Sequence, residues 1–246
     1  MIDIPMNTTQ ALDLSGGQSA FQPMSQQDFG QPTLQQDFGQ PTLQVNQQTQ
    51  SPCGKGVSLA KGQKVSLSKM NPNLDELMIG LGWDTNPNSA IPYDLDAEAF
   101  MVNAQDKIVG DEWFVFYNQP ISPDGSVRHE GDNRTGAGMG DDEIIHVKLS
   151  QVNSKVDKII FVVTINEAKQ RGHNFGQISN AYIRVVDKQT NNELVRFNLT
   201  DYYKEVTSMM VGELYKKGGE WRFNPIGAGK GMDLLELCQF YGVNVN

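Results

Sequence analysis

The chain is poor in the residues that disulfides, soft-metal sites and membrane spans require. It has two cysteines, Cys53 and Cys238, which lie far apart and follow no metal or disulfide spacing. No apolar run comes near the roughly 18–20 residues that cross a bilayer. The N-terminus, Met1 to Asn7, lacks the basic and apolar regions of a secretory signal. We therefore expect a reduced, soluble, cytoplasmic protein without a transmembrane segment.

Basic residues are also in the minority. The 246 residues include 20 Lys and Arg against 29 Asp and Glu, which gives a formal net charge of −9. This excess of negative charge argues against nucleic acid or an anionic membrane as the main partner. The length allows one large or two small domains and is enough to bury a sizeable core.

The first 54 residues lack the periodicity of helices and strands and are rich in Gln, Pro, Ser and Asn. Within them, residues 26–34 are repeated perfectly as residues 35–43, but two copies are too few for a solenoid. We predict that residues 1–54 form a disordered tail. Two alternatives remain open: Phe29 and Phe38 anchor a partner as a short linear motif, or slippage of a repeated gene segment left a sequence without function.

Residues 55–246 alternate short apolar segments with polar turns, which is typical of a β-sandwich. We predict an all-β domain of two mostly antiparallel sheets, with one short C-terminal helix over 233–241 that begins at Asp233 as N-cap. Gly227–Met232 matches neither the P-loop nor the dinucleotide pattern, and we interpret it as a loop before that helix. Strands are expected at 57–59, 65–67, 74–84, 94–102, 113–117, 127–130, 144–149, 156–165, 181–187, 193–199, 208–215 and 220–224.

A loop at residues 131–143 concentrates oxygen donors and glycines. Its donors are four carboxylates, one carboxamide and one hydroxyl: Asp132, Asp141, Asp142, Glu143, Asn133 and Thr135. Carboxylates this close repel one another unless a cation lies among them, and donors without Cys or His favour a hard divalent ion, Ca²⁺ before Mg²⁺. For the loop alone, the alternative is a solvated acidic hairpin.

A second group of carboxylates lies at two strand ends. Asp94 and Asp96 share one face of an expected strand, while Leu95 and Ala97 share the other. Asp is a poor strand former, so this pair indicates either chelation or a solvated edge strand, and the strand itself does not distinguish them. Asp84 follows Trp83, an expected core residue, where another strand gives way to a polar loop.

Other catalytic or binding patterns fail. The acidic loop has the length of an EF-hand loop, but Arg134 and Ala137 stand where that loop needs an oxygen ligand and a glycine. Cys238 falls inside the expected helix, which favours a core role over nucleophilic catalysis. The three histidines are spread along the chain.

Six motifs taken in order resemble the TerD family, the tellurium-resistance and general stress proteins of bacteria. The resemblance covers about Gly56 to the C-terminus and leaves the tail outside. The motifs that carry it are Gly80-Leu81-Gly82-Trp83-Asp84, Asp94-Leu95-Asp96-Ala97, Phe114-Val115-Phe116-Tyr117-Asn118, Ser122-Pro123-Asp124-Gly125-Ser126-Val127, the loop 131–143 and Asn174-Phe175-Gly176-Gln177.

The resemblance implies a β-sandwich of two sheets that binds Ca²⁺ through loops at one end. Two adjacent ions would use the donors more fully than one, because each Ca²⁺ takes about six to eight oxygens. Ala137 and Met139 stand where relatives often carry acidic residues, a departure that lowers the charge of the loop. Carried over by motif position, the implied ligands are Asp84, Asp94, Asp96, Asn118, Asp132, Asn133, Thr135, Asp141, Asp142 and Glu143.

The resemblance implies a non-catalytic, calcium-binding stress-response protein whose metal-loaded face engages partner proteins, related stress-response proteins among them. Two alternatives remain. In one, the carboxylates activate water in a metal-dependent phosphoester hydrolase. In the other, a bound cation bridges the protein to a small ligand or oxyanion. The sequence leaves the oligomeric state and the physiological ligand open.

Overall fold

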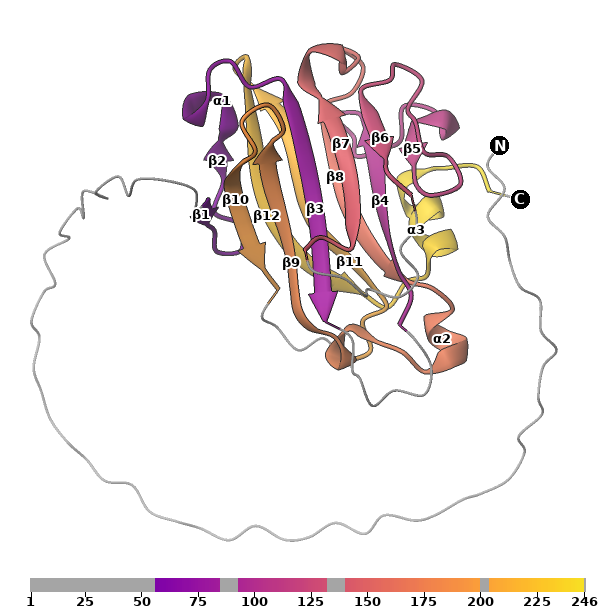
Figure 1. Ribbon diagram of the computed structural model, residues 1–246. Coiled ribbons are helices and arrows are strands. Elements are labelled where there is room, and N and C mark those ends of the chain that lie inside the picture. The colour runs from indigo at the N-terminus through magenta and orange to yellow at the C-terminus, as the bar shows by residue number, and fades with distance from the viewer. Residues whose placement is uncertain (1–55, 85–92, 132–139, 200–203, 246) are drawn as a thin grey trace, which may run out of the picture. The chain divides into compact units, whose positions relative to one another are not determined.

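The computed structural model describes residues 56–84, 93–131, 140–199 and 204–245. It confirms the predicted β-sandwich, in which one sheet lies in front of the other (Figure 1). The predicted tail, residues 1–54, and most of the acidic loop lie outside the described residues. None of the helices in the described ranges is long and apolar enough to cross a membrane.

Two six-stranded sheets make up the described part of the chain. Every pairing is antiparallel except that of β1 with β10. The first sheet has the order β1-β10-β9-β3-β7-β6 and the second β2-β12-β11-β8-β4-β5. The strands are β1 Val57–Ser58, β2 Val65–Ser66, β3 Glu76–Asp84, β4 Leu95–Val102, β5 Phe114–Val115, β6 Val127–His129, β7 Glu143–Lys148, β8 Lys158–Ile165, β9 Ser179–Asp187, β10 Asn192–Asn198, β11 Ser208–Lys217 and β12 Glu220–Lys230.

The main core lies between the two sheets. Alternation along each strand directs one set of apolar side chains inward, such as Leu77, Ile79 and Leu81 of β3, which are at most 1 % exposed. Trp83 continues this row and is buried, as expected. Two short helices, α1 Leu67–Met70 and α2 Ala168–Arg171, lie in the connections.

The C-terminal helix α3, Leu234–Tyr241, is confirmed. Asp233 caps it: its side chain accepts from the Glu236 N–H while Glu236 reaches back to the Asp233 N–H. Leu237, Cys238 and Tyr241 pack with apolar residues of β4, β5 and β8 in a second core cluster. Because α3 and the other sheet cover opposite faces of β4, every residue of that strand is buried. The interpretation of β4 as a solvated edge strand is therefore wrong.

Two expected elements differ most in extent from those observed. The strand expected at 113–117 is shortened to Phe114–Val115, because a turn of 3₁₀ helix covers Asp111–Trp113. The loop expected at 227–232 is wrong over its first four residues, since β12 runs on through Lys230. A register shift opposite Met210 and Gly212 of β11 lets the glycine-rich segment continue the ladder.

Candidate metal centre

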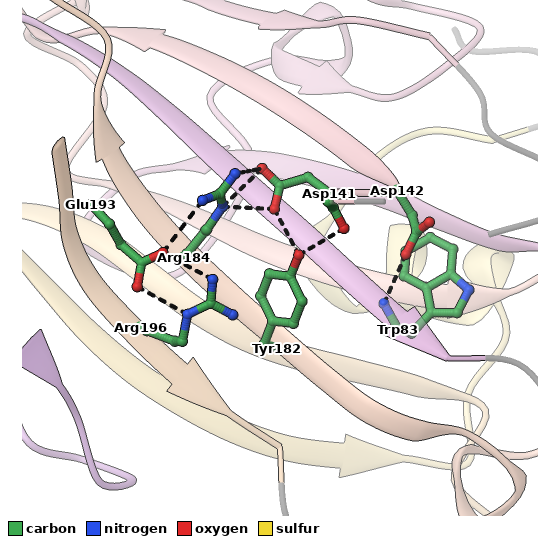
Figure 2. Close-up of polar contacts among 8 residues, drawn as sticks. Trp83, Asp141, Asp142, Tyr182, Arg184, Glu193 and Arg196 are labelled. Atoms are coloured by element: carbon green, nitrogen blue, oxygen red, sulfur yellow. Dashed lines mark hydrogen bonds and ion pairs between the residues drawn. The ribbon is translucent and has the colours of Figure 1, made fainter. Parts of the chain in front are cut away.

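The strand register brings predicted ligands together at one end of the sandwich. β3 ends at Asp84 and β7 begins at Glu143, and the two strands pair antiparallel with Leu81 opposite Glu143. Asp142, one residue before β7, donates its N–H to the Leu81 carbonyl at 2.7 Å. Its Oδ2 accepts from the Trp83 N–H at 2.8 Å. The backbone therefore fixes the Asp142 carboxylate beside the end of β3 (Figure 2).

Asp142 carries the clearest electrostatic signature of this end. Burial raises the pKa of its carboxyl above the usual range, and repulsion from Asp141, Asp84 and Glu143 adds to the shift. A cation placed among these groups would remove the repulsion and return the pKa of Asp142 toward its ordinary value. Four of the predicted ligands therefore lie close enough for their charges to interact: Asp84, Asp141, Asp142 and Glu143.

Glu143 enters the site from the interior. Its side chain and that of His129 on β6 are both 1 % exposed, and Oε2 of Glu143 lies 2.9 Å from Nε2 of His129. The imidazole faces a carboxylate that burial would otherwise leave costly to ionise. His129 also accepts the Gly131 N–H on Nδ1 at 3.0 Å. This contact positions the chain just before the acidic loop.

β4 contributes a third row of carboxyls along one face: Asp94, Asp96 and Glu98. Oδ2 of Asp94 accepts from the Asn166 side-chain amide at 2.9 Å, while its buried Oδ1 has no hydrogen-bond partner among the described residues. Asp96 is buried at 8 % exposure. An unsatisfied buried oxygen costs about 1–3 kcal/mol, so the orphaned oxygen of Asp94 is suited to a cation.

Glu98 continues this row of carboxyls but is not among the ligands predicted from the sequence. It is fully buried, and its Oε1 accepts from the Thr164 hydroxyl at 2.6 Å while Oε2 has no partner in the described structure. Burial raises the pKa of Glu98 well above its usual range, and Asp96 and Glu143 add to this by repulsion. The signal that could have identified it is the unbroken alternation of acidic residues at 94, 96 and 98.

Asp141 has a different environment from its neighbours (Figure 2). Its carboxylate accepts three hydrogen bonds from the Arg184 guanidinium at 2.7–3.0 Å and one from the Tyr182 hydroxyl at 2.9 Å. Arg184 also pairs with Glu193, which binds Arg196, whose guanidinium lies 4.2 Å from the centre of the Tyr182 ring. These five side chains form a closed ring of contacts on the outer face of the first sheet.

The ring of contacts depends on two glycines of β3. A Cβ at Gly80 would clash with the Asp141 carboxylate, and one at Gly82 would lie 2.5 Å from the hydroxyl of Tyr182. Both side chains therefore lie flat across β3 where it has no side chains of its own. This accounts for the Gly-Leu-Gly spacing that precedes Trp83. Burial, together with the charge of Asp141, raises the pKa of Tyr182 to about 12.

Of the other predicted ligands, two are exposed at the surface and three lie outside the described residues. Asn118 is exposed in the turn after β5, and Asp84 is exposed with its Oδ2 accepting from the Asn180 amide at 2.6 Å. Asp132, Asn133 and Thr135 lie outside the described residues. Within the described ranges no three His, Cys, Asp or Glu side chains by themselves form a cluster that could hold an ion. A complete cage would need further donors from outside these ranges.

The described residues with nucleophilic or basic character are held in other contacts. Cys238 lies on the buried face of α3, and this burial raises the pKa of its thiol. His146 pairs with Glu130, and the His173 ring lies 4.2 Å from the ring of Tyr93, centre to centre. Burial lowers the pKa of His173, with a further contribution from Arg171. None of these groups is arranged with a partner as nucleophile and base.

The sequence is similar to known proteins over this whole domain. The TerD domain matches residues 56–241. Tellurium resistance protein TerD of Serratia marcescens is 48% identical over 190 residues, which cover 77% of this chain and 99% of that protein. General stress protein 16U of Bacillus subtilis (strain 168) is 47% identical over 77% of this chain and 98% of its own length. The crystal structure of a homologue of telluride resistance protein (TerD) from Streptomyces coelicolor A3(2) is similar with a TM-score of 0.53 and 25% identity, over 66% of this chain and 94% of that one.

Gly80→Ala should destabilise the domain because the new methyl group displaces Asp141 from Arg184. We expect a loss of about 1–3 kcal/mol in the free energy of unfolding, the usual cost of overpacking, measured by urea denaturation. In an Asp141→Ala background the same substitution should cost almost nothing, because the space above Gly80 is then empty. Equal costs in both backgrounds would show that Asp141 does not lie over Gly80.

Glu98→Gln should stabilise the metal-free protein at neutral and alkaline pH. An unfolded glutamate ionises near pH ~4.3, whereas burial keeps Glu98 protonated to a much higher pH, so the fold loses stability as the pH rises above that value. The variant should therefore exceed wild type in urea midpoint at pH 8, with a difference that shrinks toward pH 4. Asp157→Asn, which alters an exposed carboxylate, is the control. A gain independent of pH would contradict the assignment.

Proposed function

The chain belongs to the TerD domain family, and from this premise we propose that it is a calcium-binding, non-catalytic stress-response protein. Relatives in the family are named for tellurium resistance and for general stress. In this proposal the protein acts in the cytoplasm, and its calcium-loaded acidic end engages other proteins, including related stress-response proteins.

The observation that carries the proposal is the crowding of carboxylates around Asp142. Burial and the charges of Asp84, Asp141 and Glu143 together disfavour its ionised form. A fold that positions a carboxylate by two backbone hydrogen bonds and surrounds it with like charge is stable in charged form only when a cation is present. The buried Oδ1 of Asp94, which has no hydrogen-bond partner among the described residues, supports a bound cation next to β4 as well.

The donors fit a hard ion that prefers oxygen. We propose that Asp84, Asp94, Asp96, Asp142 and Glu143 supply the carboxylates of the centre and that Asn118, Asp132, Asn133 and Thr135 complete it, with room for two ions. When bound, Ca²⁺ neutralises the acidic end. This removes the electrostatic barrier that would repel an acidic partner, such as another protein of similar charge.

Asp141 has a positioning task in this proposal. Arg184 and Tyr182 already engage both of its carboxylate oxygens, so the residue holds the end of the loop against β3. Its neighbour Asp142 then turns the opposite way, toward the Trp83 N–H. The ring of contacts would thus orient the loop before an ion arrives, which lowers the ordering cost of binding.

The absence of catalysis is proposed from the described side chains. A hydrolase needs a base or nucleophile held at a defined geometry near the reacting atoms. His129, next to the centre, is buried against Glu143, and His146 and His173 are held in other contacts. The buried Cys238 thiol is likewise unsuited to direct chemistry on tellurite.

Calorimetric titration of chelator-treated full-length protein tests the proposal. We expect Ca²⁺ to bind more tightly than about 10⁻⁵ M, within the range of calcium sensors, and Mg²⁺ to bind much more weakly. The double variant Asp94→Asn, Asp142→Asn should lose this binding, because it removes the orphaned oxygen and the most crowded carboxylate. The number of equivalents distinguishes one ion from two.

Asp157→Asn is the matched control for the titration, since it removes an exposed carboxylate next to the Val102 end of β4, opposite to the end that begins after Asp94. It should leave the affinity unchanged. Heat of binding that is equal for Ca²⁺ and Mg²⁺, or that survives in the double variant, would contradict a specific centre. Circular dichroism of each variant verifies that the fold persists.

A further inference from the structure

We propose that a cationic cleft at the opposite end of the first sheet binds a small organic dianion, of the class of phosphate monoesters. The cleft has a volume of about 360 Å³, toward the lower limit of small-molecule sites. Its lining combines three cationic side chains, Arg128, Lys148 and Lys188, with Glu76, His146 and the exposed Ile121.

The register of β3 and β7 places the cleft far from the candidate metal centre. Glu76 begins β3 and is opposite Lys148, which ends β7, whereas Asp84 and Glu143 stand at the other ends of the same strands. Eight residues of strand separate Glu76 from Asp84, or roughly 26 Å. The two sites therefore lie at opposite ends of a shared pair of strands, β3 and β7.

The cleft is positive within a strongly negative protein. Arg128 and Lys188 are exposed, and neither has a carboxylate partner among the described residues. Lys148 is balanced by Glu76 at 3.7 Å. With one anion against three permanent cations, the lining carries a net charge of about +2 at neutral pH. This matches a dianion and contrasts with the −9 of the whole chain.

His146 adds an unused polar atom to the lining. Its Nε2 contacts Glu130, while its buried Nδ1 has no hydrogen-bond partner in the described structure. A buried nitrogen left unpaired is costly unless a ligand or water satisfies it. The tautomer whose Nε2 donates to Glu130 leaves Nδ1 as an acceptor, suited to a water or a ligand hydroxyl. The directional N–H donors that phosphate oxygens accept therefore come from the guanidinium of Arg128.

An exposed apolar side chain of the cleft indicates that the ligand has an organic body. Ile121 lines the cleft and is 51% exposed, whereas Leu77 and Val147, which also border it, are buried in the core. A purely inorganic anion would leave this surface unused. An anionic head beside the cations and an apolar group against Ile121 would use both parts of the lining.

Isothermal titration calorimetry with 1-naphthyl phosphate, on the full-length protein in EGTA, tests the proposal. The chelator removes binding through a metal ion at the acidic end, so the result does not depend on the proposed calcium function. We expect submillimolar binding, weaker binding of inorganic phosphate, and none of uncharged 1-naphthol. The double variant Arg128→Gln, Lys188→Gln should lose about tenfold or more, as expected for charged hydrogen bonds.

Lys217→Gln is the matched control, because Lys217 is an exposed lysine on the β11–β12 hairpin outside the cleft. It should bind as wild type does. Three outcomes would overturn the proposal: no binding of 1-naphthyl phosphate, an equal loss in Lys217→Gln, or equal binding of 1-naphthol. Ile121→Ser should reduce the preference for 1-naphthyl phosphate over inorganic phosphate, and an unchanged preference would contradict the role of the apolar surface.

Discussion

Mutual repulsion of carboxylates at one end of the sandwich is the constraint around which this domain is arranged. The antiparallel pairing of β3 with β7 brings Asp84, Asp142 and Glu143 together, and β4 adds Asp96 and Glu98 from the second sheet. The pairing cannot form without this crowding, since the same hydrogen bonds that close the ladder fix the acidic residues. Each carboxyl must then be neutralised, paired or protonated.

The fold meets this constraint differently at each residue. Arg184 neutralises Asp141 on the outer face, His129 faces Glu143 in the interior, and Glu98 is held protonated by burial. Asp142 and the orphaned oxygen of Asp94 are left without a cationic partner among the described residues. A divalent ion bound at these groups would complete the neutralisation. Stability and metal affinity would then be two results of one arrangement.

The sequence predicted the parts of this structure that depend on local pattern. Alternation identified the strands, Asp233 marked the helix start, and the acidic spacing identified the strand ends that meet. Contacts between segments that are distant in the sequence could not be predicted from local pattern. Full burial of β4 follows from α3 packing on its outer face, and the turn of Asp141 away from Asp142 follows from Gly80 leaving space over β3.

The cationic cleft, too, could not be predicted from local sequence pattern. Its cationic residues come from β6, β7 and the turn after β9, and each is unremarkable in its own segment. Only the strand order places them together. The net charge of the chain, −9, conceals a local excess of positive charge because it averages over the surface. Composition therefore limits the partners of a whole chain more reliably than those of one site.

Tb³⁺ luminescence excited through tryptophan would locate a cation bound beside Asp142. Trp83 donates its N–H to Asp142, whereas Trp113 and Trp221 belong to other segments. Sensitised emission from Tb³⁺, an ion that prefers oxygen as Ca²⁺ does, should fall sharply in Trp83→Phe. The emission should persist in Trp113→Phe and Trp221→Phe. It should be lost when Ca²⁺ displaces Tb³⁺. Emission that survives loss of Trp83, or that Ca²⁺ does not displace, would place the ion elsewhere and contradict the account.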